Sequence, residues 1–83
     1  MNLSVRVFAS FRQQVGAGAV DLELGPEPRV RDLLAAMGQA YPAIGAGLAS
    51  AMVAVNLEYV GPDYRLNPED EVAIIPPVSG GVG

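Results

Sequence analysis

The chain has 83 residues, of which 51% are hydrophobic, and this predicts one small packed domain. Nine acidic and five basic side chains give a net charge of −4, so the chain lacks the basic surface of a nucleic-acid-binding protein. The sequence contains no Cys, His, Lys, Thr or Trp, so it has no thiol nucleophile, no usual general base and no set of transition-metal ligands, and it argues against an autonomous enzyme or a metalloprotein. No apolar run approaches the about 20 residues of a membrane span and no signal peptide is recognisable at the start, so we expect a cytoplasmic domain that other proteins act on or bind, with no membrane partner.

The first predicted element is a strand over residues 3–9, where apolar and polar side chains alternate. Its buried face comprises Leu3, Val5 and Val7. Phe8 falls on the polar face. Either a helix or loop covers this ring, or the ring is exposed as an anchor for a partner protein.

A short helix and a second strand are predicted next. Ser10 and Gln13 have the spacing of a capping box, which predicts a helix from Ser10 to Val15. Gly16 is expected to end this helix. Residues 19–24 alternate again and predict a strand that pairs antiparallel with the first.

Apolar residues recur at helical spacing over residues 30–40, which predicts the main helix. Its apolar stripe comprises Val30, Leu33, Leu34, Met37 and Tyr41. Asp32 lies in the first turn, where the helix dipole favours an anion. Arg29 stands at the position of a cap and is a poor capping residue, so the predicted start is poorly capped.

Shorter elements follow the main helix. Residues 43–49 predict one or two helical turns in which Ile44 and Leu48 face inward. Residues 51–56 predict a third strand, and a turn then leads to a short return strand that starts at Tyr59.

The last predicted strand covers residues 72–75, an unbroken apolar run typical of a central strand with both faces covered. The three acids Glu69 to Glu71 precede it. They can form a metal site or a solvated turn, and the turn-forming residues around them favour the turn. Pro76 lacks a backbone donor and ends the strand.

The order strand, strand, helix, strand, short strand, strand predicts an α+β fold. One main helix packs on one face of a mixed sheet of four to five strands, and the first and last strands lie parallel in its middle. This is a β-grasp arrangement, as in ubiquitin. We predict a β-grasp domain over residues 1–77 and a flexible C-terminal tail over residues 78–83.

The predicted tail has the composition of an arm that enters the active site of another protein. Pro76 and Pro77 favour an extended, stiff chain. Gly80 and Gly81 have no side chains, so they can pass through a narrow channel. A terminal carboxylate is a poor electrophile, and a partner enzyme must activate it before sulfide or an amine can attack.

The sequence resembles the sulfur-carrier family that contains the small subunit of molybdopterin synthase, MoaD, and the thiamine sulfur carrier, ThiS. The similarity covers nearly the whole chain. Its motifs are Val5-Arg6-Val7-Phe8-Ala9 with Arg12, Val30-Arg31-Asp32-Leu33-Leu34, Val55-Asn56, Asp70-Glu71-Val72-Ala73 and Ile75-Pro76-Pro77-Val78-Ser79-Gly80-Gly81. The proline pair before the glycines resembles the molybdopterin synthase subunit more than the thiamine carrier.

The resemblance implies a sulfur carrier in molybdenum cofactor biosynthesis with no bound cofactor. A MoeB-like adenylating enzyme would use ATP and Mg²⁺ to activate the terminal glycine, and a sulfur donor would convert it to a thiocarboxylate. The tail would then enter the large subunit, MoaE, and donate sulfur to a pterin precursor. All catalytic side chains would belong to the partners, so the chain would be a non-catalytic subunit of a sulfurtransferase.

The resemblance also implies the site residues. The residue that becomes the thiocarboxylate is Gly81. The sheet surface that binds both partners would contain Phe8, Tyr59 and Ile75, although an aliphatic residue is common in the family where Tyr59 stands. The segment that enters the partner comprises Pro76, Pro77, Val78, Ser79 and Gly80.

The chain departs from the family pattern after Gly81, where Val82 and Gly83 follow. Proteolytic removal of the pair, a fusion or cloning remnant, and direct use of Gly83 as the thiocarboxylate are all open, and removal or a remnant is favoured. Direct use would lengthen the tail by about 7 Å.

Three other functions remain alternatives. The first is a sulfur carrier for thiamine, cysteine or tRNA thiolation. The second is a ubiquitin-like protein modifier, which the lack of Lys would restrict to single tags. The third is a β-grasp interaction domain without covalent chemistry, for which residues 78–83 would be dispensable.

Overall fold

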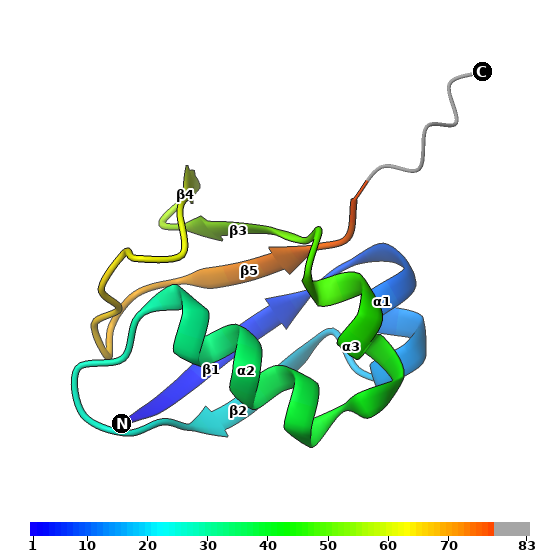
Figure 1. Ribbon diagram of the computed structural model, residues 1–83, viewed down its shortest axis with the longest axis horizontal. Coiled ribbons are helices and arrows are strands. Elements are labelled where there is room, and N and C mark those ends of the chain that lie inside the picture. The colour runs from blue at the N-terminus through cyan, green and yellow to red at the C-terminus, as the bar shows by residue number, and fades with distance from the viewer. Residues whose placement is uncertain (78–83) are drawn as a thin grey trace.

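The computed structural model describes residues 1–77 (Figure 1). Its elements are β1 (Asn2–Val7), α1 (Ala9–Val15), β2 (Ala19–Glu23), α2 (Val30–Ala40), the 3₁₀ turn η1 (Pro42–Ile44), α3 (Gly45–Leu48), β3 (Met52–Val55), β4 (Glu58–Val60) and β5 (Val72–Ile75). The expected elements are therefore present in the expected order. None of the helices in this described part has the length and hydropathy to cross a lipid bilayer.

The five strands form one mixed sheet in the order β2-β1-β5-β3-β4 (Figure 1). β1 pairs antiparallel with β2 and parallel with β5. β3 pairs antiparallel with both β5 and β4. The predicted β-grasp fold is confirmed, including the parallel contact between the first and last strands at the centre of the sheet.

The hydrophobic core lies between the helices and the face of the sheet that they cover, called here the inner face. The alternation in β1 and β2 and the stripe of α2 meet in this layer. The residues in it that are less than 2% exposed are Leu3, Val5, Val7, Val30, Leu33, Met37, Ile44, Val72 and Ile74. The helices cover only one face of the sheet, so Ala73 and Ile75 on the other face are half-buried. The prediction that both faces of the last strand are covered was therefore wrong.

The first helix starts earlier than the capping box predicted. α1 begins at Ala9 and its N-cap is Phe8, without a side-chain cap. The carbonyl of Phe8 accepts hydrogen bonds from the N–H groups of Phe11 and Arg12 at 3.1 and 3.3 Å. Ser10 thus lies inside the helix, and its role as N-cap was wrong. Gly16 ends the helix in the left-handed conformation (φ 86°), as predicted.

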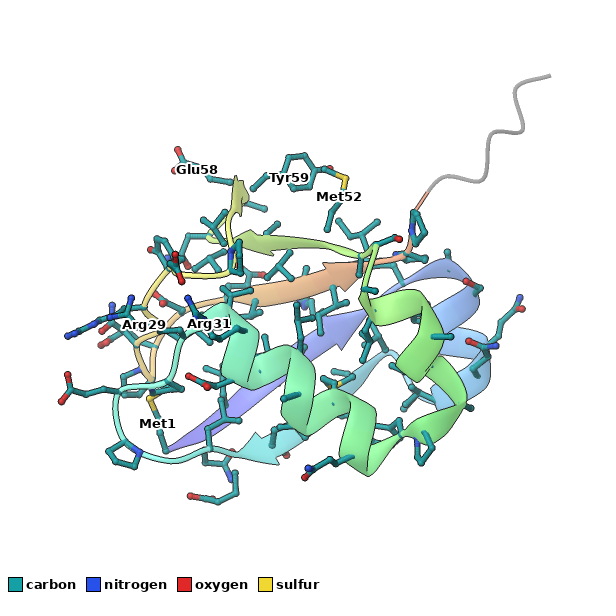
Figure 2. All side chains as sticks on the ribbon, viewed as in Figure 1. Met1, Arg29, Arg31, Met52, Glu58 and Tyr59 are labelled. Carbon is teal, nitrogen blue, oxygen red and sulfur yellow. The ribbon has the colours of Figure 1, made fainter. Side chains whose placement is uncertain are left out.

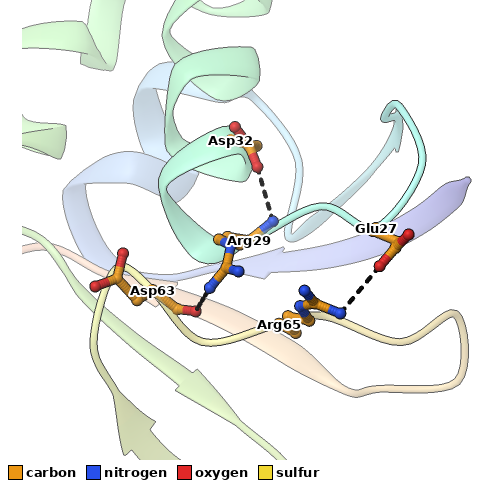
Figure 3. A network of polar contacts seen from close by, with 5 residues as sticks. All are labelled: Glu27, Arg29, Asp32, Asp63 and Arg65. Atoms are coloured by element: carbon orange, nitrogen blue, oxygen red, sulfur yellow. Dashed lines mark hydrogen bonds and ion pairs between the residues drawn. The ribbon is translucent and has the colours of Figure 1, made fainter.

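The start of α2 is better capped than the sequence indicated. The Asp32 carboxylate Oδ2 accepts a hydrogen bond from the backbone N–H of Arg29 at 2.8 Å (Figure 3). The guanidinium of Arg29 has no acceptor, so only this half of a capping box can form. Asp32 therefore both satisfies an orphan donor and neutralises part of the helix dipole. Arg29 is a poor capping residue, as predicted, but the start of the helix is not left uncapped, because Asp32 and the carbonyls of Tyr64 and Pro62 accept its donors.

The loop after β4 is tied to the same helix start. Arg29 Nη1 donates to the carbonyl of Asp63 at 2.8 Å, and Arg65 Nη1 donates to Glu27 Oε1 at 2.9 Å (Figure 3). Arg29 and Arg65 also form an antiparallel backbone bridge. All these side chains are exposed or half-buried, so the contacts position the loop rather than supply much stability.

Two glycines of α3 are expected to respond in opposite ways to alanine. A Cβ on Gly47 would lie 2.9 Å from Cε1 of the buried Phe11, whereas a Cβ on Gly45 would meet nothing within 4 Å. We expect Gly47→Ala to destabilise the domain by about 1–3 kcal/mol through overpacking. We expect Gly45→Ala to stabilise it by about 0.5–1 kcal/mol through helix propensity.

Urea unfolding of the two alanine variants beside the wild type measures both effects. Each variant is the matched control for the other, because the substitution and the helix are the same. Equal changes in the free energy of unfolding would contradict the close contact between Gly47 and Phe11.

Candidate docking site on the open face of the sheet

The face of the sheet that carries no helix, called here the outer face, is apolar at one end. Val7 on β1 pairs with Ile74 on β5, so the next residues, Phe8 and Ile75, lie side by side where both strands end. On its other side Ile75 pairs with Met52 at the start of β3. Strand alternation directs the side chains of Ile75 and Met52 away from the core, and this end of the outer face therefore presents large apolar groups.

Tyr59 extends this surface to the edge of the sheet. It pairs with Ala54, which in turn pairs with Ala73 of β5. Figure 2 shows Tyr59 beside Met52. The side chains that form this surface, called here the docking patch, are Phe8, Met52, Ala54, Tyr59, Ala73 and Ile75.

Three aromatic or aliphatic side chains of the docking patch are strongly exposed. Phe8 is 41% exposed, Met52 45% and Tyr59 65%, while Ile75 is half-buried. Of the two interpretations of Phe8, the exposed ring is the one in the structure, although Phe8 caps α1 instead of lying in β1. Contiguous exposed apolar side chains on a small domain mark a binding surface.

The resemblance implied Phe8, Tyr59 and Ile75 as binding residues, which stays a prediction, and the structure places all three in the docking patch, together with Met52, which was not expected. The signal was available, because Met52 precedes Val53 and alternation must place the two side chains on opposite faces. Val53 is buried in the core. Met52 therefore belongs to the outer face, and its flexible thioether suits a surface that binds more than one partner.

The tail leaves the domain at the docking patch. Pro76 and Pro77 directly follow Ile75, and they are half-buried and exposed respectively. Any partner that holds the residues after Pro77 is thus brought against the patch. The predicted roles of Val78, Ser79, Gly80, Gly81, Val82 and Gly83 lie outside the described residues and stay predictions.

The three acids before β5 form a turn, as favoured from the sequence. Asp70 Oδ2 accepts from the N–H of Asn67 at 2.8 Å, and Asp70 Oδ1 accepts from Asn56 Nδ2 at 3.1 Å. The N–H of Glu71 donates to Asn56 Oδ1 at 3.0 Å. Within residues 1–77 no group of three or more His, Cys, Asp or Glu side chains is placed to hold a metal ion.

The surface of the described residues offers an apolar area suited to recognition. No polar or charged side chain among residues 1–77 is buried. The four ion pairs of this part of the chain are formed by groups with solvent access. The docking patch and the adjacent start of the tail are its distinctive surface features.

Comparison with known proteins agrees with this description. The ThiS family model matches residues 5–81. A relative from Chlamydomonas reinhardtii, named molybdopterin synthase sulfur carrier subunit, is 41% identical over 83 residues and covers 98% of this chain and 100% of the relative. The resemblance seen in the sequence is confirmed.

Two solved structures have the same fold. The putative molybdopterin converting factor subunit 1 from Pyrococcus furiosus superposes with a TM-score of 0.82 at 31% identity, over 94% of this chain and 99% of that one. SAMP1 from Haloferax volcanii superposes with a TM-score of 0.85 at 26% identity, over 98% of this chain and 100% of that one. With the family match over nearly its whole length, the chain belongs to the ThiS family of β-grasp proteins.

Proposed function

We propose that this chain is the sulfur carrier subunit of a molybdopterin synthase and acts in the cytoplasm. The observation that carries the proposal is the position of the docking patch, which adjoins the point where the chain leaves the sheet after Ile75. One partner surface can therefore bind the patch and receive the tail together. The relative from Chlamydomonas reinhardtii, and others named in the same way, support this assignment over other pathways.

The proposed reaction uses the glycine carboxylate as the group that carries sulfur. A MoeB-like enzyme with ATP and Mg²⁺ joins a carboxylate oxygen to the α-phosphate and releases pyrophosphate. Sulfide from the sulfur donor then attacks the acyl carbon, and AMP leaves as the carbon–sulfur bond forms, with loss of the sulfide proton. The resulting thiocarboxylate enters the large subunit, MoaE, which provides the catalytic side chains for transfer to the pterin precursor.

In this proposal Gly81 carries the thiocarboxylate and Val82 and Gly83 are removed first. The family model supports Gly81, because its match extends to that residue. The residues from Pro76 to Gly80 would then lie in the partner's channel, where small side chains and glycines let the chain pass.

The proposal is tested by incubating the chain with an adenylating enzyme, ATP and a sulfur source, followed by intact mass measurement. We expect a thiocarboxylate on a form that ends at Gly81. A known carrier is incubated in parallel to establish that the enzyme is active. If the enzyme modifies that carrier and neither form of this chain, the proposal is wrong.

A protein modifier is the second candidate, and the similarity to SAMP1, a small archaeal modifier protein, favours it. The same activated glycine would then be attacked by a lysine amine of a target protein instead of by sulfur. The two functions separate in one reaction that contains both a sulfur source and target proteins. A stable thiocarboxylate without conjugates supports the carrier, and isopeptide conjugates support the modifier.

A further inference from the structure

The edge of the sheet formed by β4 is open. Among residues 1–77, β4 pairs only with β3. Asn56 and Leu57 join the two strands, both with positive φ (52° and 71°), as a type I′ hairpin turn requires. In such a hairpin the closing pair, Val55 and Glu58, exchanges both hydrogen bonds, and the next pair exchanges none. The backbone N–H and C=O of Tyr59 therefore point to the free edge, where an added strand can bind them.

Leu57 at the tip of this hairpin is unusual. Its backbone is left-handed (φ 71°) and its side chain is 90% exposed. Leucine is disfavoured in this conformation, which Asn and Gly adopt with less strain. A strained apolar residue that is almost entirely in water contributes little to the free domain, and such outliers point to function.

An apolar groove of about 290 Å³ lies behind the open edge, between the hairpin and the helices α2 and α3. Its lining includes Leu34, Leu48, Met52, Tyr59 and Val60. Met52 and Tyr59 also belong to the docking patch. The groove is therefore continuous with the surface that the tail's partner would cover, and it can accept an apolar side chain from the same partner.

The surroundings of the hairpin are acidic. Glu58 follows Leu57, and no ion pair of the described residues includes Glu58. Asn56 at the other end of the turn is bonded to the side chain of Asp70 and the N–H of Glu71. Arg6 lies 3.9 Å from Glu71, and Arg31 beside the loop after β4 is paired with Asp63. This charge balance complements a basic binding partner.

We infer that the partner that receives the tail adds an extended segment to β4 as a further strand. The segment is apolar with basic flanking residues, its backbone bonds to Tyr59, one apolar side chain enters the groove, and Leu57 becomes covered. The inference rests on the proposed function, because the partner is the large subunit named there. It concerns a second contact of that subunit, at the edge of the sheet rather than on its outer face.

The backbone contact is tested by comparing Tyr59→Pro with Tyr59→Ala. Both variants remove the phenol ring, but only proline removes the outward N–H, and it leaves the bonds to β3 intact. The measurement is calorimetric titration with the molybdopterin synthase large subunit. We expect proline to bind about two- to tenfold more weakly than alanine. Equal affinities would overturn the strand addition.

Leu57→Asn gives an independent test that does not risk the fold. Asparagine tolerates the left-handed backbone, so we expect the thermal midpoint to stay the same or rise, while affinity for the large subunit falls about tenfold. A merely structural role for Leu57 would change stability and binding in the same direction. An unchanged affinity would overturn the proposal.

The charge argument has a matched control at the opposite edge of the sheet. Glu58→Lys and Asp21→Lys change the net charge equally, and Asp21 is an exposed residue of β2. We expect only the first to weaken binding, by about threefold or more at low salt. Equal losses would overturn the local role of the hairpin.

Two further outcomes separate the inference from the proposed function. If the wild-type chain does not bind the large subunit at all, the proposed function and the inference both fail. If it binds and the β4 variants bind equally well, only the inference fails. The remaining possibility is that a second copy of this chain binds the β4 edge, and light scattering tests it by measuring the molecular mass. If the wild type is a dimer and Leu57→Asn is a monomer, the edge binds a second copy and the inference is wrong.

Discussion

Ile74→Ala is expected to remove most of the free energy of unfolding, whereas Ile75→Ala leaves the domain stable and weakens partner binding. The two isoleucines are neighbours in β5, and the same atoms are removed from each. Ile74 is fully buried at the centre of the core, and Ile75 is half-buried in the docking patch. Their different consequences follow only from the face of the sheet that each side chain occupies.

The size of the first effect follows from cavity formation. Truncating a buried isoleucine costs about 2–5 kcal/mol, because neighbours on β1, β3 and α2 cannot close the void fully. A domain of this size has a free energy of unfolding near the lower end of about 5–15 kcal/mol. We therefore expect Ile74→Ala to shift the urea midpoint strongly and to lose partner binding indirectly.

The second effect appears in binding. Truncating Ile75 should cost about 1 kcal/mol of stability or less, but it removes an apolar anchor between Phe8 and Met52. We expect affinity for the large subunit to fall about 10- to 100-fold, as for a central interface residue. Urea unfolding and calorimetric titration of both variants test this. If Ile75→Ala binds as the wild type does, the docking patch is not the interface.

Local periodicity explains why the fold could be predicted. Alternation in residues 2–7 and 19–23 and the stripe of α2 are properties of short segments, and each segment must bury its apolar side. α2 spans Val30–Ala40, the predicted range. The central position of β5 also followed from local composition, because Val72–Ile75 is the most apolar run.

The predictions that were wrong concern helix caps and the exposure of a strand face, which depend on tertiary structure. Ser10 has the right residue type and spacing for a cap, but the N-cap is Phe8 and the helix begins two residues too early for Ser10 to cap it. Asp32 caps α2 although the side chain of the N-cap residue, Arg29, has no hydrogen-bond acceptor. The exposed face of β5 could not be predicted from β5 alone, since an apolar run does not say where the helices lie.

Some residues of the candidate site can be recognised from one segment of the sequence, and others only from the fold. Phe8 stood out because an aromatic ring broke the polar face of a strand, a signal in one segment. Met52 and Leu57 did not, because their importance depends on an edge, a turn and a groove that assemble from β3, β4 and the helices. Functional surfaces of this kind are built from several segments, so sequence patterns indicate single members and the fold gathers the rest.

The position of the terminal carboxylate should control sulfur transfer more strongly than any side chain of the described domain. We expect a form that ends at Gly81 to support transfer and the 83-residue form to be slower by about 100-fold or more. The two additional residues move the carboxylate by up to about 7 Å in an extended chain, and displacements of about 1 Å can cost 100-fold when reacting groups must be aligned.

Binding distinguishes this effect from a loss of recognition. Both forms carry the same docking patch, so their affinities for the large subunit should agree within about threefold, since the patch residues supply the anchors. The measurement pairs calorimetric titration with single-turnover transfer from the preformed thiocarboxylate of each form. A form that ends at Gly80 is one residue too short, so its carboxylate is displaced in the opposite direction. It should bind the large subunit with similar affinity and also transfer sulfur slowly. If the 83-residue form transfers sulfur as fast as the form that ends at Gly81, then Gly83 can carry the thiocarboxylate, and the partner's channel is longer than the family pattern implies.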